Sequence, residues 1–359
     1  KRVLWSLNLD QIIWGPYSLK NHRTDSRDIV VQDSTNEIHY IGANGKVKWS
    51  KVIDGKILGR PFQIDAFQNN KFQFLFNTEK SIYAIDILGN SLENFPIALP
   101  LRATNEVVAL DYDQNNNYRL LIALEDNRIY NYDLLGNFVL GWEKPLVKSP
   151  IHHPISHFAI GGLDYILTIQ DSGVVNLYNR KGQLRLALKA EIDILLGSDY
   201  FIEKSYNIDS SSITFINTQG GISKYVFSSD EPIVMGDTAQ QQATTTTLHI
   251  SNNRELFYCK KSKNTLEIVL DGDQEYNYNI DYPFEILSAN GNFVPIFNSK
   301  TKEMQLINKK FSLSKDYFRS SNQFCIIDIN RDEIDELVTI LDKELLVCYQ
   351  IGTTNNSSN

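Results

Sequence analysis

One acidic loop carries oxygen-bearing residues at a spacing that suits a hard cation. Residues 328–336 read DINRDEIDE, and the possible ligands stand at positions 1, 3, 5 and 9 of this loop: Asp328, Asn330, Asp332 and Glu336. Carboxylate and amide oxygens in such loops bind calcium. Position 6, where a calcium loop usually has glycine to permit a sharp turn, is Glu333. Two interpretations therefore stay open, a calcium site and an acidic turn without a metal.

Other chemistry-bearing residues do not form a recognisable site. Histidines cluster once, at 152–157 (HHPISH). On an extended strand His153 and His157 would lie about 13 Å apart, at about 3.3 Å per residue, which is too far for shared metal ligation. The sequence has no G-x-S-x-G, H-E-x-x-H or G-x-x-x-x-G-K-[ST] motif. We therefore expect no catalytic residues, no enzyme and no cofactor other than the possible calcium.

Charge and hydropathy exclude two classes of partner. The 359 residues include 35 Lys and Arg against 43 Asp and Glu, a net charge of −8. Proteins that bind DNA or RNA normally concentrate an excess of basic residues on one face. No apolar run approaches the roughly 18 residues that a membrane span needs. We expect neither a nucleic-acid partner nor a membrane span, and a lipid anchor would have to lie outside this chain.

A repeat organises the chain. Four segments share an alternating apolar strand, a turn on glycine and a second strand: 38–49, 82–96, 129–142 and 175–188. Their turn glycines are Gly45, Gly89, Gly136 and Gly182, spaced by 44, 47 and 46 residues. Weaker copies follow, with turn markers near Ser229, Gly272, Asn308 and Gly352. Each copy resolves into four short strands joined by Gly and Asn turns, and we find no convincing helical periodicity.

This pattern predicts an all-β fold, an eight-bladed β-propeller of four-stranded antiparallel blades. The last copy stops after its third strand, and Arg2–Ser6 (RVLWS) matches the fourth strand of the first copy, Lys46–Ser50 (KVKWS). The N-terminal strand is therefore expected to complete the last blade. Seven blades are the alternative if the copy at 291–319 is irregular. We expect a single domain over residues 1–352 and a disordered polar tail over 353–359.

Two family resemblances follow from the repeats. Units such as SIYAID followed by LGN (81–90) resemble the quinoprotein-type propeller repeats of bacterial envelope proteins, including the propeller lipoprotein of the outer-membrane β-barrel assembly machinery. The segments DIVVQD (28–33), KFQFLFNTEKSIYAID (71–86), ALDYDQNNNYRLLIALEDNRIYNYD (109–133) and HPISHF (153–158) are similar to the C-terminal propeller of a Bacteroidota envelope family of unknown function. The resemblance fades after about residue 190. It implies location in the bacterial cell envelope (periplasm or outer-membrane associated). It does not indicate any particular activity.

A partner would bind where each outer strand crosses to the next inner strand, because function concentrates on loops held by a rigid scaffold. Aromatic residues, arginines and histidines recur in these crossings: Trp14, Tyr17, Arg60, Arg102, His152, His153, Tyr200, Tyr282, Tyr317 and Arg319. Tyrosine, tryptophan and arginine are enriched at interface hot spots. We therefore expect a non-catalytic protein-interaction scaffold, whose partner is another protein or another domain of a longer chain. The alternative is a propeller that binds carbohydrate or another small ligand, with sugars stacked on Tyr200 beside Asp199 or on Trp14 and Tyr17.

Overall fold

A computed structural model describes residues 2–235, 245–250, 256–262, 264–270, 275–287 and 293–352. These residues form strands and turns and contain no helix, so none of the described elements is a helix long and apolar enough to cross a membrane. The fold is the predicted eight-bladed β-propeller, and the seven-bladed alternative is wrong. The chain divides into two compact units, Asp54–Leu248 and the pair of segments Lys1–Ile53 and His249–Asn359. The single domain over residues 1–352 stays a prediction, and the tail 353–359 lies outside the described residues.

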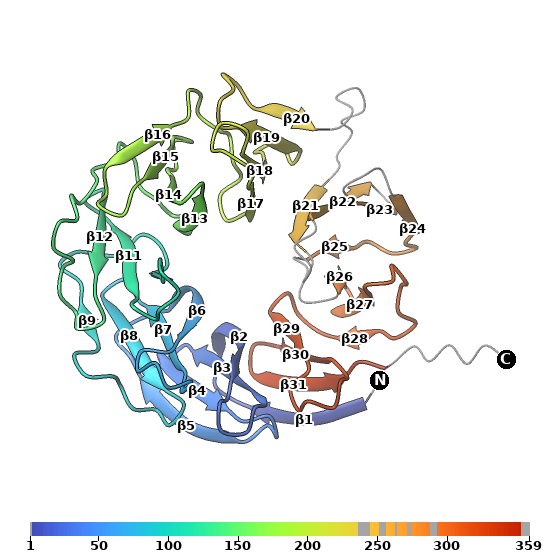
Figure 1. Cartoon of the computed structure of the whole chain (residues 1–359). Coiled ribbons are helices and arrows are strands. Elements are labelled where there is room, and N and C mark those ends of the chain that lie inside the picture. The colour runs from blue at the N-terminus through green and yellow to red at the C-terminus, as the bar shows by residue number, and fades with distance from the viewer. Residues whose placement is uncertain are drawn as a thin grey trace. The chain divides into compact units, whose positions relative to one another are not determined.

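The unit Asp54–Leu248 contains four antiparallel sheets among its described residues (Figure 1). Their strands, sheet by sheet, are β6 (Leu58–Ile64), β7 (Gln73–Asn77), β8 (Ser81–Asp86) and β9 (Ile97–Ala98); β10 (Val108–Leu110), β11 (Arg119–Leu124) and β12 (Arg128–Tyr132); β13 (Ser156–Ile160), β14 (Leu163–Ile169), β15 (Val175–Tyr178) and β16 (Leu184–Ala187); and β17 (Tyr200–Glu203), β18 (Ser212–Ile216), β19 (Ile222–Val226) and β20 (Ile233–Met235).

The other unit contains four further sheets in the described part of the chain. Their strands are β2 (Ile12–Lys20), β3 (Arg27–Asp33), β4 (Glu37–Ile41) and β5 (Val47–Val52); β21 (Thr245–Ile250), β22 (Leu256–Ser262), β23 (Thr265–Leu270) and β24 (Glu275–Asn279); β25 (Glu285–Ile286), β26 (Val294–Asn298), β27 (Glu303–Ile307) and β28 (Phe318–Arg319); and β29 (Phe324–Ile327), β30 (Glu336–Leu341), β31 (Leu345–Gln350) and β1 (Arg2–Asn8). The four turn glycines of the clear repeats all adopt positive φ, as predicted, and Gly272 lies outside the described residues.

The middle strands of the blades are apolar on both faces because each face packs on a neighbouring blade. In β11, Leu120, Ile122 and Leu124 join the core with the blade β6–β9. Leu121 and Ala123, which point to the opposite face, join the core with the blade β13–β16. A strand buried on both faces reads as a continuous apolar run, as RLLIAL does.

One blade departs from the predicted four strands. The sheet β10–β11–β12 has three, and its fourth position is taken by residues that form only two isolated bridges, Tyr132 with Phe138 and Arg128 with Leu146. Gly141 at φ 82° and Pro145 lie within this segment and interrupt regular pairing. The Trp142 indole N–H donates to the Ile129 carbonyl at 2.8 Å, so that part of the open edge is covered by a side chain.

The N-terminal strand completes the last blade, as predicted. β1 pairs antiparallel with β31 from Arg2 opposite Gln350 to Asn8 opposite Leu345. The Trp5 indole N–H donates to the Ala43 carbonyl at 2.9 Å, and its ring lies on Gly45, where an added Cβ would come within 2.6 Å of it. The first strand is therefore fixed both by its β31 partner and by the turn of the adjacent blade.

Deleting residues 1–9 should lower the melting temperature strongly and promote aggregation, because the deletion exposes the edge of β31 and removes Trp5 from the packing. Loss of one large packed side chain typically costs about 2–5 kcal/mol in the free energy of unfolding. Thermal unfolding followed by circular dichroism measures the effect. Val3→Ala is the control, since Val3 is 53% exposed and should change little. Equal melting temperatures for the deletion and the parent would contradict the role of β1.

Candidate functional site

The antiparallel order of strands gives each sheet two chemically distinct ends. The segment that enters the first strand lies at the same end as the hairpin between the second and third strands, and we call this the crossing end. The loops between the first and second strands and between the third and fourth strands lie at the opposite end, the turn end. The predicted partner-binding residues belong mainly to the crossing ends, and the acidic loop 328–336 belongs to a turn end.

Three predicted residues of the unit Asp54–Leu248 are exposed at the crossing end. The two arginines form ion pairs, Arg60 with Asp199 at 4.0 Å and Arg102 with Glu79 at 3.7 Å, and the His152 ring lies 2.6 Å from the Asp171 carboxylate. Both arginines are about two-thirds exposed (66% and 68%). Exposed ion pairs of this kind contribute little to stability, so the arginines remain available to a partner.

Two predicted residues of the same unit serve packing instead. His153 is buried, and this burial lowers its pKa. The Tyr200 hydroxyl lies 2.6 Å from the Ser156 hydroxyl and donates to the Pro154 carbonyl at 2.8 Å. Burial raises the pKa of Tyr200. Both side chains join β17 to the preceding blade, which leaves them little surface for a partner or a sugar.

A buried asparagine that the sequence did not single out connects three blades. The Asn105 side-chain oxygen accepts from the Ala123 N–H at 2.9 Å, and its side-chain nitrogen donates to the His153 carbonyl at 3.3 Å. The Asn105 carbonyl in turn accepts from the Asn77 side chain at 3.2 Å. The crossing end of this unit is therefore held in shape by buried amide side chains.

Two further features of this crossing end were not predicted. The Glu106 carboxylate accepts from the Arg60 backbone N–H at 2.8 Å, and burial raises the pKa of Glu106. An added Cβ on Gly59, at φ 60°, would collide with Glu106. Leu195 and Leu196 are 43% and 63% exposed on the crossing into β17. The only sequence signal for these exposed residues was the pair of leucines before Gly197. A pair of apolar residues predicts burial just as well, so exposure could not be predicted from it.

The predicted partner-binding residues of the other unit are partly buried and partly exposed. Trp14 is buried and packs on Tyr17, with ring centroids 4.6 Å apart. The Tyr282 hydroxyl donates to the Gln305 side chain, and its ring lies 6.2 Å from that of Tyr317. The two exposed members are Tyr317 and Arg319, and Arg319 pairs with Asp342 at 3.3 Å. Trp14 therefore does not offer the exposed ring face that a sugar would need.

The acidic loop 328–336 is shaped by hydrogen bonds from its own backbone. The Asp328 carboxylate accepts from the N–H groups of Arg331, Asp332 and Glu333 at 2.6, 3.2 and 3.0 Å. The Asp332 carboxylate accepts from the Ile334 N–H at 3.0 Å. Glu333, which replaces the expected glycine, adopts the left-handed φ of 66°. The turn therefore forms without glycine at position 6.

Two other loops in the described part of the chain form the same turn without an acid at position 9. Asp65 accepts from the N–H groups four and five residues later, Asn69 and Asn70, and Asp111 does the same with Asn115 and Asn116. In all three loops the residues three and five positions after the aspartate have positive φ. The loop at Asp65 has Phe67 at position 3 and Gln73 at position 9, so the turn needs no cation ligands there.

Position 9 links the loops chemically. The Glu336 carboxylate accepts from the Ile329 N–H at 2.9 Å, and the Gln73 amide oxygen accepts from the equivalent Ala66 N–H at 2.9 Å. Glu336 is fully buried, its other oxygen has no partner within the described residues, and burial raises its pKa to about 7. Glu336 therefore takes the place of Gln73 as the acceptor that closes the turn, a role that an acidic turn without a metal would also need. Calcium binding stays a prediction that titration tests.

Acidic and histidine side chains converge elsewhere in the described chain, at Asp33, Glu37 and His39, whose ligand atoms lie within 4.8 Å of one another. Both ring nitrogens of His39 are engaged, one with Asp33 at 2.9 Å and the other with Ser50 at 2.8 Å. The other Asp33 oxygen accepts from Thr35 and from the Glu37 N–H. Because its polar atoms already have partners, we interpret this cluster as a strand-turn network rather than a metal site. His157 also has its own carboxylate, Asp164 at 2.7 Å.

No family model and no curated protein sequence matches the chain, so the predicted membership of a Bacteroidota family is unsupported. Solved structures do match. BamB from Moraxella catarrhalis gives a TM-score of 0.56 at 11% identity over 98% of both chains. BBS1N in complex with ARL6DN gives 0.55 at 8% over 99% of both. Dihydro-heme d1 dehydrogenase NirN in complex with DHE gives 0.55 at 10% over 97% of this chain and 77% of that one. At these identities the likeness shows the propeller fold alone.

Asn105→Ala should lower the free energy of unfolding by about 2 kcal/mol or more, because each buried polar group left without a partner costs about 1–3 kcal/mol. Urea unfolding followed by fluorescence measures the change. Asn322→Ala is the matched control at an exposed position. A variant at position 105 as stable as this control would show that the blades do not depend on the buried amide.

Glu336→Gln should become more stable relative to the parent as pH rises. The folded-state pKa of Glu336 is about 7, above the usual value of 4.5, so its contribution to stability is complete below about 4.5 and is lost as pH rises through 7. Between pH 5 and pH 8 the difference in unfolding free energy should shift by on the order of 2 kcal/mol toward the variant.

Thermal melts of both proteins across this pH range, each with EDTA and with millimolar calcium, provide the measurement. The acidic-turn interpretation expects the same melts with and without calcium. Calcium that raises the melting temperature of the parent and not of Glu336→Gln would establish the calcium site instead.

Proposed function

We propose that the chain is a non-catalytic protein-interaction scaffold of the bacterial cell envelope, which binds a protein or another domain of a longer chain at the crossing end of its sheets. The observation that carries the proposal is the surface of the unit Asp54–Leu248. There the side chains of Arg60 and Arg102 are exposed, and so are the apolar side chains of Leu101, Leu195 and Leu196 on crossings of the same unit. Arginine next to apolar surface is the composition of an interface core.

The connections that carry these side chains are ordered before any partner arrives. The Ala103 N–H donates to the Glu79 carbonyl at 2.8 Å, which ties the crossing after β9 to the β7–β8 hairpin. Leu195 N–H donates to the Ile216 carbonyl at 2.8 Å, and the Leu195 carbonyl accepts from Ser198. A surface that is ordered in advance loses less conformational entropy on binding.

Residue chemistry supports a binding role over catalysis. Glu106, the acid at this end with a raised pKa, is bound to a backbone N–H, and its neighbours Arg60 and Asp199 pair with each other. The sequence contains no G-x-S-x-G, H-E-x-x-H or G-x-x-x-x-G-K-[ST] motif. The fold itself does not decide, since NirN shares it and is a dehydrogenase, so the proposal rests on these side chains.

The proposed partner and location have separate support. BBS1N, a match by fold, is in complex with ARL6DN. Location in the bacterial envelope rests on the resemblance of the repeats to quinoprotein-type propellers of that compartment. The net charge of −8 supports a protein partner over nucleic acid.

The double variant Arg102→Glu and Leu196→Glu should reduce recovery of the partner from gently crosslinked bacterial envelope extracts by more than about tenfold, since interface hot spots are worth about 2 kcal/mol or more. Quantitative mass spectrometry of the purified complex measures the loss. The control, Lys71→Glu with Leu135→Glu, changes one exposed cationic and one exposed apolar residue at the turn end and alters the net charge by the same amount. A protein that elutes alone, or equal recovery with both double variants, would overturn the proposal.

A further inference from the structure

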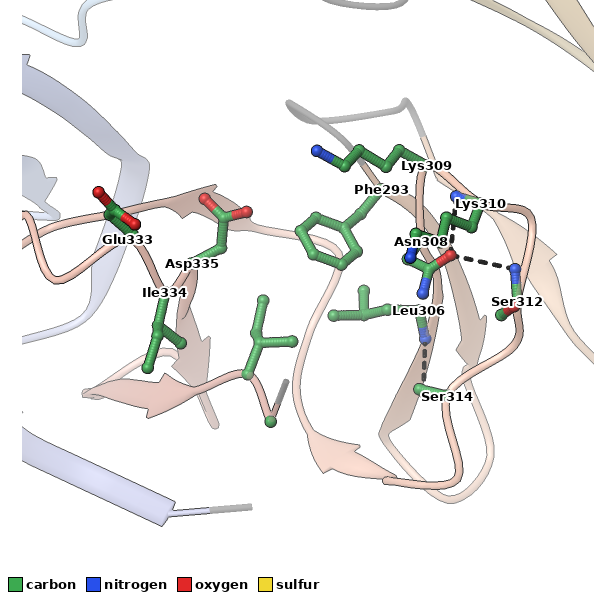
Figure 2. A pocket seen from close by; sticks show the side chains of 12 residues that line it. Phe293, Leu306, Asn308, Lys309, Lys310, Ser312, Ser314, Glu333, Ile334 and Asp335 are labelled. Carbon is green, nitrogen blue, oxygen red and sulfur yellow. Dashed lines mark hydrogen bonds between the residues drawn. The ribbon is translucent and has the colours of Figure 1, made fainter. Parts of the chain in front are cut away.

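A separate cavity lies at the turn end of the unit that contains the last two blades. It has a volume of about 280 Å³ and lies between the β27–β28 turn, residues 308–312, and the acidic loop 328–336 (Figure 2). The size is just below the roughly 300–1,000 Å³ of pockets for drug-sized ligands, so its occupant must be small. The residues that carry the proposed partner surface belong to the other unit, Asp54–Leu248.

The two walls of the cavity carry opposite charges. The turn 308–312 contributes Lys309 and Lys310, and the acidic loop contributes Glu333 and Asp335. Figure 2 shows the Phe293 ring between Asp335 and the lysine-bearing turn. Within the described residues no ion pair joins the two walls, although Lys309 acts electrostatically on Asp335. The charges therefore face each other across the opening without neutralising each other directly.

The base of the cavity is apolar. Phe293, Leu306, Ile334 and Ile351 line it. Leu306 and Ile351 are buried, whereas Phe293 and Ile334 are only partly covered. A ligand that fits must combine a small apolar body with a positive group at one end and a negative group at the other.

Both walls hold their shape mainly through hydrogen bonds of their backbone groups. In the lysine-bearing turn, the Asn308 side chain accepts from the N–H groups of Lys310 and Ser312 at 2.9 and 3.1 Å. Phe311, at φ 55°, stacks on Tyr276 at 4.2 Å, and its carbonyl accepts from the Tyr278 hydroxyl at 2.7 Å.

The acidic wall is fixed in a similar way. Glu333 N–H donates to Asp328 at 3.0 Å, and the Asp335 carbonyl accepts from the Ile351 N–H at 3.0 Å. These two bonds use backbone groups, the Asp335 carboxylate also accepts a backbone hydrogen bond from Asp328, and Glu333 and Asp335 both line the cavity. Preorganised charges of opposite sign favour a ligand with matching charges, because little reorganisation is needed on binding.

We propose that this cavity binds a small zwitterion of the size of a dipeptide, with its carboxylate at Lys309 and Lys310, its ammonium at Asp335 and Glu333, and its apolar side chain on Phe293. This ligand site is independent of the partner surface at the crossing end. The double variant Arg102→Glu and Leu196→Glu should therefore bind the zwitterion as the parent does.

Isothermal titration calorimetry of the full chain with glycyl-leucine tests the proposal. N-acetyl-glycyl-leucine lacks the ammonium, and glycyl-leucine amide lacks the carboxylate. Each should bind at least about tenfold more weakly than the zwitterion, because a charge-assisted hydrogen bond contributes more than the free energy of one decade in affinity. No heat at millimolar glycyl-leucine, or equal affinity for all three compounds, would overturn the proposal.

Variants locate the site. Asp335→Asn and Lys309→Met should each weaken binding of glycyl-leucine at least about tenfold, since each removes one charged contact. The matched controls are Glu344→Gln and Lys315→Met, exposed residues outside the cavity, which should bind as the parent does. Lysine side chains dimethylated with ¹³C keep their charge and report binding without a substitution. The signals of Lys309 and Lys310 should shift on titration and that of Lys315 should not. Binding with no shift at Lys309 or Lys310 would overturn the assignment.

Discussion

The structure depends on one constraint: no blade can bury both of its apolar faces by itself. The second and third strands are apolar on both sides, and within each unit one face packs on the preceding blade and the other on the following blade. β11 shows this most clearly, because Leu120 and Leu121, adjacent in sequence, belong to different cores. The N-terminal strand follows the same logic, since Leu4, Trp5 and Leu7 pack into the core shared by the blade β2–β5 and the blade β29–β31. Stability is therefore a property of neighbouring pairs of blades, as in other repeat architectures.

Buried polar side chains repeat this dependence at the crossing end. Asn105 bonds to Ala123 of its own blade, to Asn77 of one neighbouring blade and to His153 of the other. Tyr200 bonds to Ser156 and Pro154 of the blade before it. Apolar faces tolerate small changes in the distance between blades, whereas a buried amide with fixed partners does not. The amides thus set the position of the connections between blades. The exposed arginines and leucines lie on these connections, so their positions are fixed as well. The crossing end is therefore a surface of defined shape.

The sequence predicted the fold well because its main signals are local. Glycines such as Gly45 and Gly89 mark turns through their own backbone conformation, and alternation within a strand marks which residues face a core. The three-stranded blade was not predicted because the segment IYNYDLLGNFVLGW follows the repeat pattern. Gly141 and Pro145 weaken the pairing of the fourth strand with β12, but neither residue alone indicates that the strand is missing. Trp14 and His153 were assigned to a surface by their place in crossings, but sequence cannot distinguish a buried crossing residue from an exposed one. The cavity was not predicted because Lys309 and Asp335 lie in loops of different blades, and the opposition of their charges depends on how the two blades pack.

The three equivalent turns at Asp65, Asp111 and Asp328 show how one scaffold can carry different chemistry. Each keeps the aspartate that accepts N–H groups four and five residues later, so the backbone shape is maintained by one conserved type of contact within the chain. Position 9 is Gln73, Arg119 or Glu336, an amide, a cation or an acid, in the same frame. Because the backbone bonds fix the turn, the side chains at its rim are free to vary without loss of the fold. Only the third turn places Glu333 and Asp335 opposite a lysine-bearing turn, and the resulting pair of charged walls is a property of that junction between blades and not of the repeat.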